Sequence, residues 1–426
     1  MKTMRIHRAD GAKPSTEWSQ NAGGRSRPGR GPRTRRTTAL ATGIASTLMV
    51  GALSGVATAG ATPAAAKPTN GRVDLYTPTF SNPLNITNPL FPKGPSKISQ
   101  TVALGTEPDT KLRFEATQLD QTRTIAWNGK NIMTRVTSFV AYHNGRLVEV
   151  ASDFYAQDDK GAVWYFGEDV ANYDNGVIKD HAGTWLAGKD GPPGMIMPAK
   201  PKVGDVFRPE NAAPLVFEEA TVEADNLTVP GPSGAVKGAI RVRSVLLDGT
   251  VEGKIFAPRY GEFRAEVKSA NELYFVALAG PTDSVAGPVP AELSALIRGA
   301  YRDFGDAAKG NWVRAARTTD RMNDAWEVYK DHHQVPSLLK KQMNDALKAL
   351  GNTVRAKSSV AARQDAIDVS TATLDLQLRY RGQDSVDTDR LTVWKKQLQL
   401  DTAVGDAGAI AGDRVTIHAI KARINH

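Results

Sequence analysis

One hairpin-rich stretch decides the fold. Residues 153–185 read DFYAQDDKGAVWYFGEDVANYDNGVIKDHAGTW, in which runs of strand-forming residues alternate with short polar turns. A strand over residues 147–157 is followed by DDKG at residues 158–161, and residues 162–167 begin the next strand. Asp and Gly favour tight turns at such positions. The stretch therefore predicts antiparallel strands that are joined by hairpins.

The strand that begins at residue 162 is apolar on both faces. Trp164, Phe166 and Glu168 share one face, and Val163 and Tyr165 share the other. A strand of this kind is typical of the centre of a sheet that is covered on both sides. Aromatic strand residues mostly pack in a core, so this interpretation is preferred over a ligand site.

The alternative interpretation is an aromatic pocket that is closed by the polar residues beyond the strand. Most carboxylates of residues 153–185 stand where turns need Asp in any case. The residues that the turns do not explain are the candidates for ligand binding: Trp164, Phe166, Glu168, Asp169, His181 and Trp185.

The same hairpin pattern extends in both directions. Asn-Gly pairs at residues 128–129, 144–145 and 175–176 separate strand-like runs, and Asn-Gly suits a two-residue turn with positive φ at both positions. Further strands are expected over residues 216–223, 236–247, 253–257, 262–268 and 273–278. Roughly ten strands exceed what a flat sheet holds comfortably, so the sheet should curl.

Beyond residue 290 the apolar period changes from two to about 3.6, which predicts helices with short connections. The fold class is therefore α+β, an antiparallel β meander or half-barrel followed by an up-down helical bundle. The predicted domains are an export signal and cleavage region at 1–66, an extended Pro-rich segment at 67–100, the β domain at 101–279, a linker at 280–290 and the bundle at 291–426.

The N-terminal residues explain the net charge of +9. Residues 1–66 contain ten Lys or Arg against Asp10 and Glu17, so the rest of the chain is close to neutral. The basic residues precede an apolar stretch and then small residues that suit cleavage near Ala59 or Ala66, as in an export signal. We expect a secreted or cell-envelope protein with no permanent transmembrane span and no nucleic-acid partner.

Several chemistries lack their sequence signatures. The absence of cysteine excludes disulfides and thiolate nucleophiles. No HExxH, Gly-x-Ser-x-Gly or nucleotide-binding glycine motif is present, so no catalytic residue, cofactor or metal is assigned. The dense charges of residues 365–390 are expected to form solvent-exposed pairs between helix faces.

The motif WYFGED at residues 164–169, with GTW at residues 183–185 and GMIMPA at residues 194–199, resembles a group of uncharacterised secreted bacterial proteins. The sequence LDLQLRYR at residues 374–381 resembles helical tails of secreted actinobacterial proteins. These resemblances imply that the protein is exported, and they imply no particular activity.

The preferred functional hypothesis is a non-enzymatic binding or scaffolding protein for a small-molecule, lipid or envelope ligand. One alternative is a secreted hydrolase that uses carboxylates near Glu168, which requires two of them in one cleft. Another is metal handling by the helical bundle, with His332 or His418 beside carboxylates and Met in the bundle core.

Overall fold

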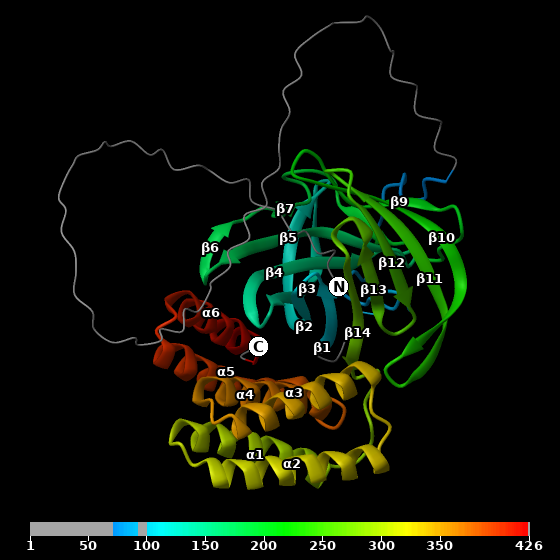
Figure 1. Ribbon diagram of the computed structural model, residues 1–426. Coiled ribbons are helices and arrows are strands. Elements are labelled where there is room, and N and C mark those ends of the chain that lie inside the picture. Colours follow the sequence, from blue (N-terminus) through cyan, green and yellow to red (C-terminus); the bar gives the residue numbers. More distant parts are fainter. Residues whose placement is uncertain (1–70, 93–99, 425–426) are drawn as a thin grey trace, which may run out of the picture. The chain divides into compact units, whose positions relative to one another are not determined.

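The computed structural model describes residues 71–92 and 100–424, and its ribbon is shown in Figure 1. Within them the chain forms one antiparallel sheet and then six helices. The strands are β1 (Gln100–Glu107), β2 (Thr110–Trp127), β3 (Lys130–His143), β4 (Arg146–Gln157), β5 (Val163–Asp174), β6 (Val177–Asp180), β7 (Trp185–Leu186), β8 (Gly194–Met197), β9 (Val206–Ala212), β10 (Val216–Gly231), β11 (Gly234–Leu246), β12 (Val251–Ala257), β13 (Gly261–Val267) and β14 (Glu272–Gly280).

The Asn-Gly turns form as predicted. Asn128, Asn144 and Asn175 have φ between 48° and 50°, and the glycine after each also has positive φ. These turns join β2 to β3, β3 to β4 and β5 to β6. Positive φ at both central residues matches the right-handed twist of the flanking strands. Local turn chemistry therefore builds this half of the meander.

The sheet is strongly curled, and its two ends lie near each other. Its strand order is β6-β5-β4-β3-β2-β1-β14-β13-β12-β11-β10-β9, so β1 pairs with β14 and joins two meanders into one sheet. Near one end, β8 pairs with β5, and it also packs beside β9 at the other end. The predicted meander with half-barrel curvature is confirmed.

The helical part begins immediately after Pro290, whose fixed φ suits the start of a helix. Its helices are α1 (Ala291–Ala308), α2 (Trp312–His332), α3 (Ser337–Arg355), α4 (Ser359–Gln377), α5 (Gln383–Val404) and α6 (Ala407–Ile424). In Figure 1, α3, α4 and α5 lie between the sheet and the outer pair α1 and α2, while α6 lies close to β4 and β6.

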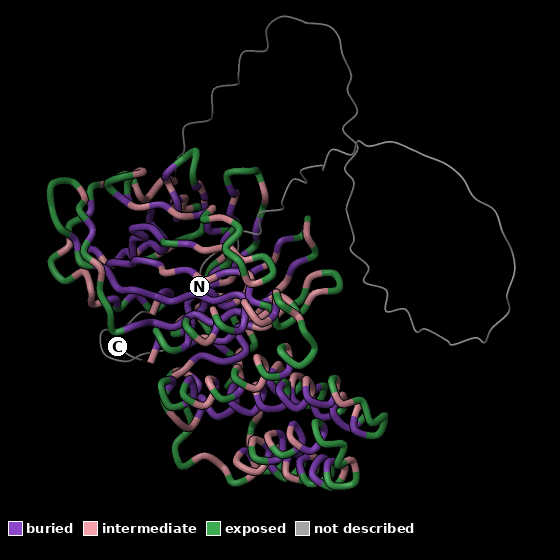
Figure 2. The backbone as a smooth tube through the Cα atoms, turned by 90° about the vertical axis from the view of Figure 1, so that its left-hand side faces the viewer, coloured by how far each residue is buried: buried purple, intermediate pink, exposed green. Residues whose placement is uncertain are grey.

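The helices and the sheet share buried surface. Val102 of β1 and Ala277 and Leu278 of β14 belong to the same apolar core as the inner faces of α1–α5. Figure 2 shows buried residues along the strands of the sheet and in the helices. None of the helices in the described part of the chain combines the length and apolar character that a membrane crossing requires.

Candidate functional site

The aromatic residues proposed as a ligand site lie in the core beneath residues 71–92. The indole Nε1 of Trp164 donates to Asp158 Oδ2 at 2.9 Å, and the ring of Phe80 packs edge-on against Phe166 at 5.4 Å. All residues from Val163 to Glu168 are buried, as expected for a strand covered on both sides. The rings of Trp164 and Phe166 are therefore covered by the chain itself.

The other four candidate residues are divided between two faces of β5 and the turn beyond it. Glu168 and Trp185 are neighbouring partners on β5 and β7, and both are fully buried. Asp169 points to the opposite face and pairs with Arg123. His181 is exposed, and its Nδ1 lies 2.6 Å from the carbonyl oxygen of Val170. Their role in ligand binding stays a prediction.

The two histidines proposed for a metal site in the bundle, His332 and His418, lie away from its core. His332 and His418 are both exposed, whereas Met322 and Met343 are buried in the core. The Nδ1 of His332 lies 2.8 Å from the carbonyl oxygen of Val328 in the preceding turn, consistent with a residue that ends a helix. Within residues 71–92 and 100–424, no group of three or more His, Asp or Glu is arranged to hold a metal ion.

A buried charge network joins the sheet to the helices. It contains three arginines and three carboxylates, Arg113, Arg390 and Arg423 with Glu115, Asp375 and Asp387. Arg113 of β2 binds Asp375 of α4 through two hydrogen bonds of 2.7 and 2.8 Å. Arg423 of α6 bridges Glu115 at 2.9 Å and Asp387 at 3.0 Å.

The charges of residues 365–390 were expected to form solvent-exposed pairs, and this expectation is wrong for Asp375, Asp387 and Arg390. Asp375 and Asp387 have no exposed surface, and Arg390 is 3% exposed. The reason is that their partners Arg113 and Arg423 come from distant parts of the chain, which spacing along a helix cannot reveal. The network belongs to the contact between sheet and helices.

Each charge of this network is compensated by opposite charges within it. Burial alone would raise the pKa of Glu115, but Arg390, Arg113 and Arg423 hold it well below its usual range. Asp375 is likewise buried, and Arg113 and Arg390 lower its pKa. Paired in this way, the three positive and three negative charges compensate one another, so the network offers no free charge to a ligand, and loss of one member would leave a buried charge uncompensated.

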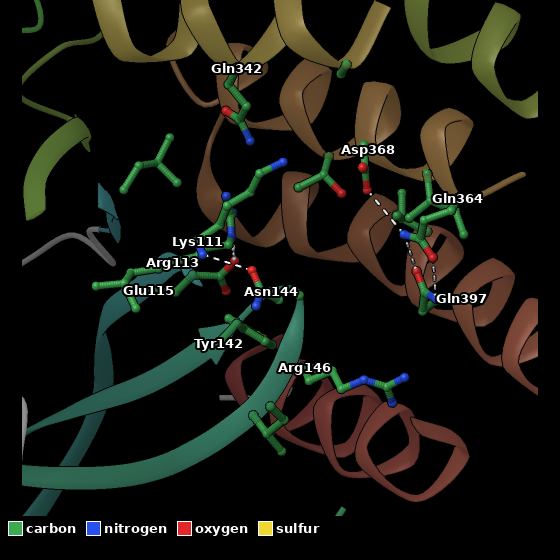
Figure 3. A pocket seen from close by; sticks show the side chains of 18 of the residues that line it. Lys111, Arg113, Glu115, Tyr142, Asn144, Arg146, Gln342, Gln364, Asp368 and Gln397 are labelled. Atoms are coloured by element: carbon green, nitrogen blue, oxygen red, sulfur yellow. Dashed lines mark hydrogen bonds and ion pairs between the residues drawn. The ribbon is translucent and has the colours of Figure 1, made fainter. Parts of the chain in front are cut away.

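A cleft of about 780 Å³ opens beside this network. Figure 3 shows that Lys111 and Tyr142 of the strands and Asn144 of the β3–β4 turn face helix residues Gln364, Asp368 and Gln397 across it. Its walls come from the ends of β1–β4 and β14 and from α3–α6. This volume lies in the usual range of small-molecule sites.

A line of polar side chains crosses the helical wall of the cleft, and we call Asp368, Gln364, Gln397 and Asp401 the carboxylate–amide chain. Gln364 Nε2 donates to Asp368 Oδ1 at 3.2 Å and to Gln397 Oε1 at 3.0 Å. Gln397 Nε2 donates to Gln364 Oε1 at 2.9 Å and to Asp401 Oδ2 at 3.1 Å. The two amides therefore bind each other, and each also binds a carboxylate on its own helix.

Asp413 of α6 lies next to Asp401, and burial, the charge of Asp401 and a hydrogen bond with it raise the pKa of Asp413 to about 8. At the other end, burial raises the pKa of Asp368 to about 6, although water reaches its side chain from the cleft. Asp413 is closely surrounded by protein, whereas Asp368 faces the open cleft. The cleft thus holds carboxylates whose charge is poorly compensated.

Sequence reasoning missed this cleft, although a signal was present. Gln364 and Asp368 on α4, and Gln397 and Asp401 on α5, repeat the pattern Gln-x-x-x-Asp. Residues four apart lie on one face of a helix, so each Gln can bind its Asp. That the two motifs face each other depends on the packing of α4 against α5, which no local pattern specifies.

No protein-family model matches this chain. No curated protein sequence and no solved structure is significantly similar to it either. The geometry of the cleft is accordingly the basis for a functional assignment.

Proposed function

We propose that the protein is an exported, non-enzymatic binding protein that takes a small organic ligand into the cleft between the sheet and α3–α6. The N-terminal residues 1–66, which lie outside the described residues, support export through their order of basic, apolar and small residues. The cleft replaces the aromatic strand as the preferred binding surface, because it is open and lined by polar groups.

The observation that carries this proposal is spare hydrogen-bonding capacity in the cleft wall. Within the described residues, the hydroxyl of Tyr142, Oε1 of Gln342 and Oδ2 of Asp413 are buried from solvent and have no hydrogen-bond partner. All three residues line the cleft. Buried polar groups are nearly always paired, so several unpaired ones behind the wall of one open space mark this wall as incompletely satisfied by the protein itself.

Apolar residues supply the rest of a binding surface. Leu112, Leu147 and Val393 line the cleft, and Trp394 is partly exposed there with its ring stacked on Tyr142 at 5.5 Å. Small-molecule sites combine such apolar walls with a few placed polar groups. This composition supports binding of an organic molecule with both polar and apolar parts.

Blocking the cleft tests the proposal. Ala349 of α3 lines the cleft, and Ala349→Trp should fill part of it. In ligand-observed NMR with a library of water-soluble amines, polyols, carboxylates and aromatic fragments, we expect hits with the mature wild type that Ala349→Trp loses. Lys348→Trp is the matched control, because Lys348 is exposed on the same helix and does not line the cleft. Hits that survive Ala349→Trp, or no hits at all, would contradict the proposal.

A further inference from the structure

The charges of the cleft are unbalanced. Three of its carboxylates, Asp365, Asp368 and Asp401, form no ion pair within the described residues, in which Arg113 and Arg390 are already engaged by the charge network. Lys341 and Arg146 are likewise paired, with Asp345 and Asp406 at 2.6 Å. Lys111, which is exposed, is the remaining cation of the wall, so the cleft has an excess of negative charge.

The carboxylate–amide chain offers a ligand only hydrogen-bond acceptors. A side-chain amide has two N–H groups, and both are used in Gln364 and in Gln397. The carboxylates at the two ends fix the orientation of these amides, because an ionised carboxylate accepts and cannot donate. The groups that remain free along this wall are carboxylate and amide oxygens. A ligand that binds them therefore has to be rich in hydrogen-bond donors.

Asp413 adds an independent sign of a missing donor. The residue is 5% exposed, it lines the cleft, and its Oδ2 has no hydrogen-bond partner among the described residues. A buried carboxyl oxygen without a donor is costly, whether or not the group holds a proton. Since Asp413 lies beside Asp401, this unmet requirement is at one end of the carboxylate–amide chain.

The carboxylates are separated along the wall by the amide pair. Asp368 marks one end and Asp401 the other, with three hydrogen bonds and one amide group between their oxygens. At about 3 Å for each hydrogen bond, this sets an upper limit of roughly 12 Å on the distance between the two ends. The amide pair lies between the two carboxylates and has no free N–H group, so two separate positive groups on one extended molecule match this arrangement better than one compact ion.

We propose that the cleft binds a linear organic diammonium compound, with one ammonium group at Asp368 and the other at Asp401 and Asp413. An ammonium group has three donors and no acceptor, which complements a wall of acceptors. The methylene chain between the two groups lies near Trp394, which is one helical turn from Gln397. Aromatic faces also attract cations.

The raised pKa values agree with a cationic ligand. Burial raises the pKa of Asp368 to about 6, with Asp365 adding to the rise, and Lys111 opposes it. These carboxyls therefore lack full charge compensation in the unliganded protein. A bound ammonium group would supply that compensation at each end.

Isothermal titration calorimetry on the mature full-length protein tests this ligand class, which rests on the proposed function because it concerns the same cleft. The probes are diaminobutane, diaminohexane, diaminooctane, hexylamine and hexanediol. We expect at least one diamine to bind about tenfold or more tightly than hexylamine, since a second charged hydrogen bond contributes about that much. Hexanediol, which has the same chain without charge, should not bind measurably.

Two variants and one control locate the ammonium groups. Asp368→Asn and Asp401→Asn should each weaken the best diamine about tenfold, to the level of hexylamine. Asp320→Asn is the control, because Asp320 is exposed on α2 and does not line the cleft. It should change diamine affinity less than about twofold.

The outcomes separate this inference from the proposed function. Absence of diamine binding, equal binding of hexanediol, or unchanged binding by both Asn variants would overturn the diammonium ligand. If other fragments still bound and were lost in Ala349→Trp, the cleft would remain the binding site with a different ligand class. Diamine binding that Ala349→Trp does not affect would overturn both proposals.

Discussion

Asp413 shows how one side chain can couple stability to pH. It is held between α5 and α6, with Asp401 beside it and with the charges of Arg146 and Asp406 acting on it from β4 and the start of α6. Burial and Asp401 raise its pKa from 3.8 to about 8, whereas Arg146 lowers it. The folded protein therefore holds a proton here that the unfolded chain releases.

The direction of the pH effect follows from proton binding. Between about pH 4 and pH 8 the folded state binds more protons than the unfolded state at this position, so its contribution to stability falls as pH rises. Asp413→Asn resembles the protonated carboxyl and cannot ionise. We expect the free energy of unfolding of this variant, relative to wild type, to increase from about pH 5 to pH 8 and then level off.

Urea unfolding across this pH range measures the difference. Asp401→Asn serves as a control of mechanism: without the charge of Asp401 the pKa of Asp413 should fall, and the pH dependence should move to lower pH. Parallel profiles for wild type and Asp413→Asn would show that Asp413 titrates normally.

At the scale of elements, the turn between β5 and β6 is fitted to α6. A Cβ atom on Gly176 would lie 2.3 Å from the backbone nitrogen of Gly412 and 2.5 Å from the carbonyl oxygen of Gly408. Glycines four apart on α6 thus leave room for the turn. The contact requires glycine for its space as well as for its φ of 74°.

A matched pair of substitutions separates these two requirements. Gly129 occupies the same turn position with φ of 71°, and nothing lies within 4 Å of a Cβ added there. Gly129→Ala should cost about 1–2 kcal/mol from backbone strain alone. Gly176→Ala should cost about 1–3 kcal/mol more in chemical denaturation, because α6 has to move. Equal costs would mean that α6 accommodates the methyl group freely.

These turns also show what local sequence can specify. Asn-Gly determines a two-residue turn through its own backbone preferences, so the hairpins at Asn128, Asn144 and Asn175 were predictable. The fit of Gly176 to α6 was not, because it joins segments more than 200 residues apart. The cleft has the same limitation, since its walls meet only when α3–α6 dock on the sheet.

For the molecule as a whole, the buried charge network unites sheet and helices. Arg423, near the end of the described chain, binds Glu115 of β2 and Asp387 of α5 with 1% of its side chain exposed. Together with the apolar core shared by β1, β14 and the helices, this favours unfolding of both parts in one transition. The sequence indicated two domains separated at residues 280–290, and it did not indicate this coupling.

Arg423→Met tests the coupling. Removing one partner of a buried network leaves Glu115 and Asp387 with too little positive charge, so we expect a loss of about 3–5 kcal/mol in the free energy of unfolding. With fluorotryptophan incorporated, ¹⁹F NMR in urea follows Trp164 in the sheet and Trp326 in the helices separately. Both signals should share one midpoint in wild type and separate in Arg423→Met.

Lys341→Met, which removes an exposed pair with Asp345, should cost less than about 1 kcal/mol and leave the midpoints together. Separate midpoints already in wild type would mean that the sheet and the helices unfold independently despite the network.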